Sequence, residues 1–214
     1  MRAPLACVSI ALFAAACGPS SRDFTKEHRP HADKIREQIG RLAAEADARP
    51  VKPNETCKPP RPLKYDPEGA GHNTDYITLE AAKKGVTYKP GETENSKLRI
   101  QGPLQLYLVW MHPDHNWATR NETVNDRAVE IVKRAQKVEF VVLTKETLNS
   151  DKGELVIDWY LADLTSSQIV CAKSFSTRKG ITPGATYLDS SELWKELNEK
   201  FADQMALNLA IKVK

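Results

Sequence analysis

Apolar residues recur along this 214-residue chain with the periods of strands and helices. Side chains of a strand point alternately to its two faces, so alternation predicts strands, whereas apolar spacings of three and four predict amphipathic helices. Apolar runs and alternations predict four strands, over residues 98–111, 138–144, 154–164 and 168–176. Pro103 restricts the start of the first strand to an edge or a bulge. The more apolar face of this strand contains Leu104, Leu106, Leu108 and Trp110.

Helical spacing predicts three amphipathic helices, over about residues 31–48, 124–135 and 189–213. Thr119, with Glu122 or Thr123, provides capping candidates for the second helix. Asp189 and Glu192 have the spacing of a capping box at the start of the third.

The predicted order is helix, Pro-rich leader, strand, helix, three strands and helix. Short turn-like connections between the last three strands favour antiparallel pairing. Amphipathic helices need a sheet face to cover, so we expect an α+β fold with an antiparallel sheet of about four strands and helices packed on one face. The domain spans residues 98–214 and follows an amphipathic helix and the Pro-rich leader.

Near its start the chain has one positively charged residue, Arg2, and then an apolar segment over residues 5–16. A dozen residues are too few to span a bilayer, which needs about 20, but suit the core of a signal peptide. Small residues then lead directly into a cysteine, in the order Ala14-Ala15-Ala16-Cys17.

These residues resemble the lipobox of the bacterial lipoprotein signal. The resemblance implies a signal peptide over residues 1–16, a lipid-modified Cys17 at the mature N-terminus, and a membrane anchor that does not cross the bilayer. Position 18 is Gly rather than the Asp common in inner-membrane lipoproteins, so the resemblance favours the outer membrane, facing the periplasm or the surface. The alternative is an ordinary secretory signal with an incidental cysteine.

The region over residues 17–97 is then expected to hold the lipidated N-terminus, the first helix and the leader. Residues 18–30 are polar and charged, and they indicate a flexible tether between the lipid and the fold. Of the four cysteines, Cys7 lies in the signal peptide and Cys17 carries the lipid. In an exported, oxidising setting the remaining Cys57 and Cys171 favour one disulfide, which would pin the leader to the domain; two free thiols are the alternative.

The charge balance gives no electrostatic case for nucleic-acid binding. The formal net charge is +3, and Arg2 is the one charged residue before position 17, so the remaining chain lacks the strong basic excess of a nucleic-acid-binding protein.

The loop around residues 112–117 is the one cluster with metal or acid-base chemistry in its residue types. It contains His112, Asp114 and His115 beside Trp117, and imidazole with carboxylate suits zinc. A further ligand at informative spacing is missing, and a solvated polar loop explains the same residues.

The sequence contains no nucleophile elbow and no phosphate-binding glycine loop after a strand. We therefore expect a non-enzymatic envelope lipoprotein without a cofactor, which binds the membrane through Cys17 and an envelope protein through its sheet edge or loops. The alternative is a small-molecule or metal binder that uses the loop with His112, Asp114, His115 and Trp117.

Overall fold

The computed structural model describes residues 20–51, 55–64, 71–86, 102–115, 117–120, 123–149 and 151–177. The predictions of a signal peptide over residues 1–16, of lipid on Cys17 and of a helix over residues 189–213 concern residues outside these ranges.

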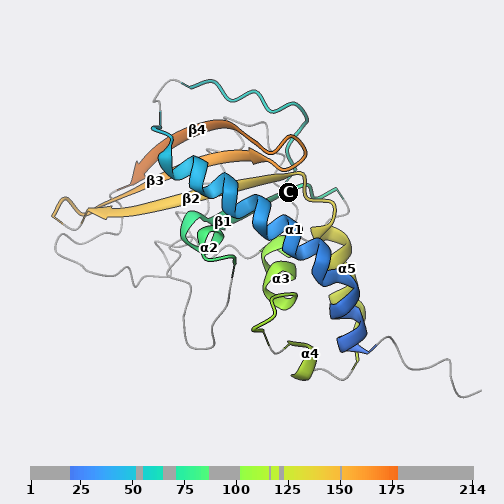
Figure 1. Ribbon diagram of the computed structural model, residues 1–214. Helices are drawn as coiled ribbons and strands as arrows, with labels where there is room; N and C mark the ends of the chain where they lie inside the picture. The colour runs from blue at the N-terminus through green and yellow to red at the C-terminus, as the bar shows by residue number, and fades with distance from the viewer. Residues whose placement is uncertain are drawn as a thin grey trace, which may run out of the picture.

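Four strands form one sheet (Figure 1). Their order is β1 (Thr74–Thr78), β2 (Phe140–Asn149), β3 (Glu154–Asp163) and β4 (Gln168–Thr177). Helix α1 (Ser21–Ala48) precedes the sheet, and α2 (Leu79–Lys83), α3 (Pro103–Trp110), α4 (Trp117–Arg120) and α5 (Asp126–Ala135) lie between β1 and β2 in the chain.

The predicted α+β class and the antiparallel meander of the last three strands are confirmed. The sheet is nevertheless mixed, because β1 pairs with β2 in parallel, with Thr74 opposite Phe140. A parallel pair needs a crossover connection, and here the crossover contains the helices between the two strands.

The strand predicted over residues 98–111 is wrong for its described part, because Pro103–Trp110 is helix α3. Both alternating sets of this segment are apolar, so alternation could not separate a strand from a buried helix. Four side chains at helical spacing are fully buried: Leu104, Tyr107, Leu108 and Met111. Pro103 occupies the first helical position, where its missing N–H costs no hydrogen bond.

The first helix is confirmed but begins earlier than expected. Residues 21–30, predicted as a flexible tether, form the first turns of α1. Ser20 caps them, since its Oγ accepts a hydrogen bond from the Asp23 N–H at 3.2 Å. Phe24 is 6% exposed and packs in the core, which explains why this charged segment is ordered as a helix. The helix continues through Pro30, beside the Tyr107 hydroxyl, which donates to the His28 carbonyl at 2.8 Å.

Helix α5 is confirmed, but its N-cap differs from the predicted Thr119, Glu122 or Thr123. The Asn125 side chain accepts the Ala128 N–H at 2.9 Å. Asn and Thr are both good capping residues, so the sequence could not choose among neighbouring candidates.

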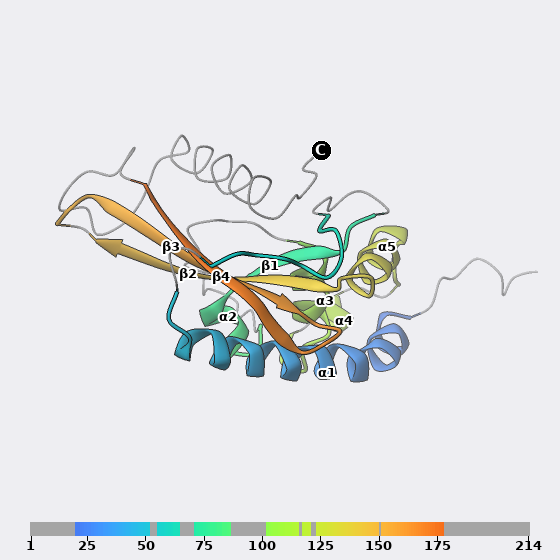
Figure 2. The ribbon, with the colours of Figure 1, turned by 90° about the horizontal axis from the view of Figure 1, so that it is seen from above.

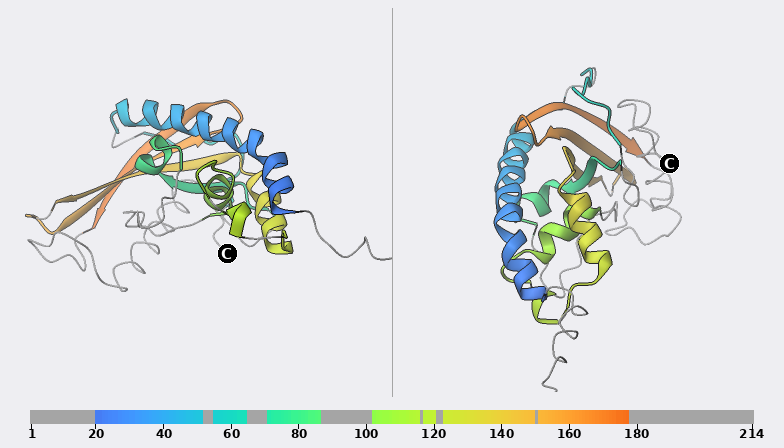
Figure 3. Two further views of the ribbon diagram at one scale, coloured as in Figure 1. Left: turned by 60° about the horizontal axis from the view of Figure 1, so that its bottom comes forward. Right: turned by 90° about the vertical axis from the view of Figure 1, so that its right-hand side faces the viewer.

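Apolar side chains are buried on both faces of the sheet. One face packs against α1, α2, α3 and α5, which lie together on that side (Figures 2 and 3). Alternation along β2 divides its side chains, so that Val141 and Leu143 face these helices while Phe140 and Val142 join the second cluster. Leu63 also belongs to the second cluster, so the Pro-rich leader packs on the sheet. Helix α1 and strand β1, both before residue 98, are thus part of the same core as the meander.

Candidate functional site

The histidine loop, defined here as residues 111–115, follows α3 and packs beside the first half of α1. Arg29 Nε donates to the Met111 carbonyl at 3.2 Å. Within the loop, the Nδ1 atom of His112 accepts the Asp114 N–H at 3.2 Å, and Nδ1 of His115 accepts the Trp117 N–H at 3.1 Å. Both imidazoles therefore close turns of their own backbone.

The carboxylate of Asp114 does not complete a metal site with these imidazoles. Its side chain is 90% exposed and its Oδ2 lies 3.8 Å from His112 Nδ1, the atom already used by the backbone. Among the residues that the structure describes, no three His, Cys, Asp or Glu side chains are grouped to hold a metal ion. The loop places His112, Asp114 and His115 near one another in a turn.

The environment of His112 favours its neutral form. Burial lowers the pKa of His112, and the positive charge of Arg36 lowers it further, against a smaller opposing effect of Asp114. Arg36 is held in place because its Nη2 donates to the Leu108 carbonyl at 2.7 Å. A neutral imidazole can accept the Asp114 N–H, so charge and hydrogen bonding agree.

Trp117 belongs to an aromatic cluster, which we define as Phe24, His28, Trp110 and Trp117. The Trp110 and Trp117 rings are stacked, with centroids 5.4 Å apart and planes 13° apart. Phe24 lies 6.1 Å from the Trp117 centroid and 4.4 Å from that of His28. Both indoles are partly exposed, whereas Phe24 is buried.

The aromatic cluster lies where the first turns of α1 meet α4. A bridge between Ser20 and Thr123 joins the chain after α4 to the residue that caps α1. Figure 3 shows α4 beside the N-terminal end of α1, with β4 at the opposite side of the molecule. The sequence singled out Trp117 but not its pairing with Trp110, because it assigned Trp110 to a strand core. The indication that the sequence offered for this contact was the short separation of Trp110 and Trp117, which are seven positions apart.

The predicted disulfide between Cys57 and Cys171 is confirmed, with Cα atoms 5.3 Å apart. It joins residues 114 positions apart and fixes the Pro-rich leader to β4. Cys171 is fully buried, which rules out a role as an exposed nucleophile in this state.

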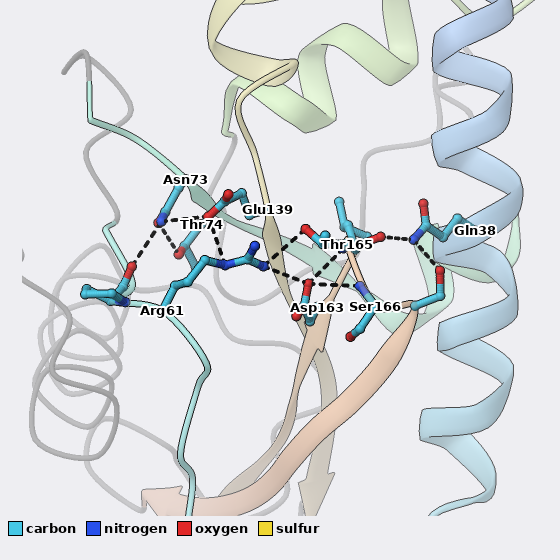
Figure 4. Close-up of polar contacts among 11 residues, drawn as sticks. Gln38, Arg61, Asn73, Thr74, Glu139, Asp163, Thr165 and Ser166 are labelled. Atoms are coloured by element: carbon cyan, nitrogen blue, oxygen red, sulfur yellow. Dashed lines mark hydrogen bonds and ion pairs between the residues drawn. The ribbon is translucent and has the colours of Figure 1, made fainter.

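Arg61 forms a second attachment of the leader, which the sequence did not predict (Figure 4). Its Nη2 donates to Asp163 Oδ1 and to Thr165 Oγ1, each at 3.1 Å, and its Nε lies 3.4 Å from Glu139 Oε2. The guanidinium also lies 5.1 Å from the centroid of the Phe140 ring. The acidic side chains here neutralise Arg61, so this network fixes the leader rather than presenting a free acid or base.

A buried carboxylate lies beneath α3. Asp75 is fully buried; its Oδ1 accepts the Tyr76 N–H at 2.8 Å and its Oδ2 accepts the Leu104 N–H at 2.7 Å. His72, also buried, has its Nε2 3.8 Å from the same Oδ2. These bonds make Asp75 a cap for α3, because free N–H groups at a helix N-terminus favour a carboxylate.

Comparisons with protein-family models, curated proteins and solved structures find no match for this chain. None of the helices in the described ranges is both long enough and apolar enough to cross a bilayer. Function must therefore be argued from the chain's own residues.

Proposed function

We propose that this chain is a non-enzymatic envelope lipoprotein, anchored by lipid on Cys17, whose folded part binds another envelope protein. The order Ala14-Ala15-Ala16-Cys17 after an apolar segment carries the proposal. Gly18 favours the outer membrane by the same resemblance.

Two structural observations support an exported, anchored chain. The Cys57–Cys171 disulfide suits an oxidising compartment outside the cytosol. Helix α1 begins at Ser21, four positions after Cys17, so a lipid on that cysteine would hold the folded part close to the membrane. Anchoring raises the effective concentration of a binding surface, which allows a weak interface to act.

Strand β4 is the best candidate for the protein-binding surface. It is one of the two terminal strands of the described sheet. Ser174 and Ser176 are exposed along it, whereas the residues of β1, the other terminal strand, are mostly buried. A terminal strand offers backbone groups to an added strand, which is a recurring mode of peptide recognition.

The anchor is tested by intact mass spectrometry of the protein purified from a bacterial envelope. We expect a chain that starts at Cys17 with added acyl mass and partitions with outer membranes. Cys17→Ala should abolish the acyl mass and the partition, and Gly18→Asp, the matched sorting control, should keep the acyl mass but move the protein to the inner membrane. An unmodified wild-type chain would contradict the proposal.

The binding surface is tested with a photo-crosslinking residue at Ser174 in cells. We expect one reproducible envelope adduct, and no such adduct when the same residue replaces Lys152, which is exposed in the turn between β2 and β3. Equal labelling at both positions would argue against β4 as the binding surface.

A further inference from the structure

We infer that the aromatic cluster and the histidine loop form the face that rests on the lipid bilayer, with Trp117 at the level of the lipid headgroups. The inference rests on the proposed lipid anchor at Cys17. It adds the orientation of the folded part and the side chains that contact the membrane.

The length of chain between the anchor and the fold restricts this orientation. Ser20 caps α1 and lies three positions after Cys17. Because an extended chain advances at most about 3.6 Å per residue, Ser20 stays within ~11 Å of the lipidated cysteine. The end of the molecule that carries Ser20 must therefore face the membrane surface.

The same end carries partly exposed aromatic side chains. Ser20 forms an antiparallel β-bridge with Thr123, and the ring centroids of Phe24 and Trp117 are 6.1 Å apart. These contacts fix α4 beside the first turns of α1, which lie nearest to Cys17 in the chain. Trp117 and its stacking partner Trp110 are both partly exposed. Tryptophan favours the boundary between water and hydrocarbon, because its ring is apolar and its N–H is a hydrogen-bond donor.

Attraction between charged side chains and lipid headgroups does not drive this docking. The exposed charged residues on the first turns of α1 are of both signs: Arg22, Asp23, Lys26 and Glu27. The Asp23 carboxylate accepts the Ser20 hydroxyl at 2.6 Å. We therefore expect docking on neutral and on anionic bilayers alike, which distinguishes burial of the aromatic rings from attraction between basic residues and anionic headgroups.

The experiment measures which end of the lipidated protein contacts lipid. Asp114→Cys places a thiol in the histidine loop, and Lys152→Cys places one in the β2–β3 turn, at the far end of the molecule from α4 in Figure 1. Cys57 and Cys171 are bonded and Cys17 carries lipid, so an environment-sensitive fluorophore reacts with the introduced thiol. The labelled protein is reconstituted in phosphatidylcholine vesicles with and without phosphatidylglycerol.

We expect blue-shifted emission at position 114 in both vesicle types, with strong quenching by headgroup-region nitroxide lipid and little by aqueous iodide. The label at position 152 should show the opposite pattern. Trp117→Ser should remove most of the lipid quenching at 114 while acyl mass stays at the wild-type value. Because Trp117 also packs against Phe24 and Trp110, the comparison is made below the variant's own unfolding temperature. Leu148→Ser, a half-buried apolar residue near the β2–β3 turn, is the matched control and should keep the quenching.

Two outcomes would overturn the inference, and they differ in what else they affect. An acylated protein whose labels at 114 and 152 are equally accessible to iodide refutes the docking face and leaves the lipid anchor intact. A protein without acyl mass refutes the anchor and, with it, this orientation.

Discussion

At the scale of single residues, Gly102 has the least room for an added side chain among the glycines with close contacts in the described ranges. A Cβ added at Gly102 would coincide with the buried Asp75 carboxyl group, which also binds the Leu104 N–H. We expect Gly102→Ala to lower the free energy of unfolding by about 3 kcal/mol, as for overpacking combined with the loss of a buried hydrogen bond. Urea unfolding monitored by circular dichroism measures this change.

The matched control is Gly40, inside α1. Its added Cβ would lie 3.6 Å from the Ala82 carbonyl oxygen, an ordinary contact. Gly40→Ala should therefore leave the protein as stable or stabilise it by up to about 1 kcal/mol, because alanine favours helix. Equal destabilisation by both substitutions would show that the Asp75 contact is unimportant.

His112 makes stability depend on pH. Burial and then Arg36 lower the pKa of His112 in the folded state, so the unfolded chain binds a proton first as pH falls below about 6.5. The contribution of His112 to stability is therefore present above that pH and is lost as pH falls toward the folded-state pKa. His31 acts in the same direction, because burial and then the charge of His28 lower its pKa.

We expect His112→Asn to reduce the fall in the free energy of unfolding between about pH 7.5 and 5.5. An asparagine oxygen can still accept the Asp114 N–H, so stability at the higher pH should change little. Urea unfolding at the two pH values makes the comparison. An unchanged pH dependence in the variant would remove His112 from this explanation.

At the scale of elements, the disulfide and the Arg61 ion pairs are two of the attachments that hold the leader. The Arg49–Glu55 ion pair and the hydrogen bonds of Asn73 with Pro62 and Lys64 are others. The disulfide closes a loop of 114 positions, for which the chain-entropy model gives about 4 to 5 kcal/mol of stabilisation. Cys57→Ala with Cys171→Ala should lower the free energy of unfolding by an amount of this order. Arg61→Ala breaks the ion pairs with Asp163 and Glu139 and should cost less, because Arg61 and Glu139 are more than one third exposed.

Limited trypsin digestion separates the disulfide from the Arg61 ion pairs. Without the disulfide we expect tryptic cleavage after Lys64 to become fast under native conditions, because the segment over residues 55–64 has no helix or strand and Lys64, unlike Lys58 and Arg61, is not followed by proline. With Arg61→Ala alone, cleavage should stay slow. Slow cleavage in the disulfide-free variant would mean that the other attachments hold the leader without the disulfide.

Local patterns predicted some elements and missed others for definite reasons. Strands β2 to β4 were predictable because short turns separate their apolar runs. Helix α3 was not, because its alternating sets are both apolar and its capping residue, Asp75, lies 29 positions before Leu104. The start of α1 was missed because Phe24 is one apolar residue among charges, and its burial depends on distant partners.

The candidate site was predictable in part. Residue types identified Cys57 and Cys171 as a pair and gathered the histidine loop, since both inferences use chemistry that is visible locally. The aromatic cluster required Trp110 to be on a helix and Phe24 to be ordered beside it. The Arg61 ion pair with Asp163 joins residues 102 positions apart, and no local pattern marks such a contact.

At the scale of the whole molecule, the proposed anchor and docking face make a prediction about the connection between Cys17 and Ser20: its length sets how firmly the aromatic cluster meets the membrane. Only Trp110 and Trp117 of this cluster are partly exposed apolar rings, so we expect weak docking that depends on a high effective concentration. About 20 inserted Gly and Ser residues give a root-mean-square reach of about 25 Å, which releases the folded part from the surface.

With that insertion after Gly18, lipid quenching of a label at position 114 should fall toward the value at position 152, while acyl mass and thermal unfolding remain unchanged. An equally long insertion in the exposed turn at Lys152 is the control and should leave the quenching at 114 intact. Undiminished quenching with the long connection would mean that the aromatic face binds lipid strongly by itself. Orientation would then come from that face and not from the short connection to the anchor.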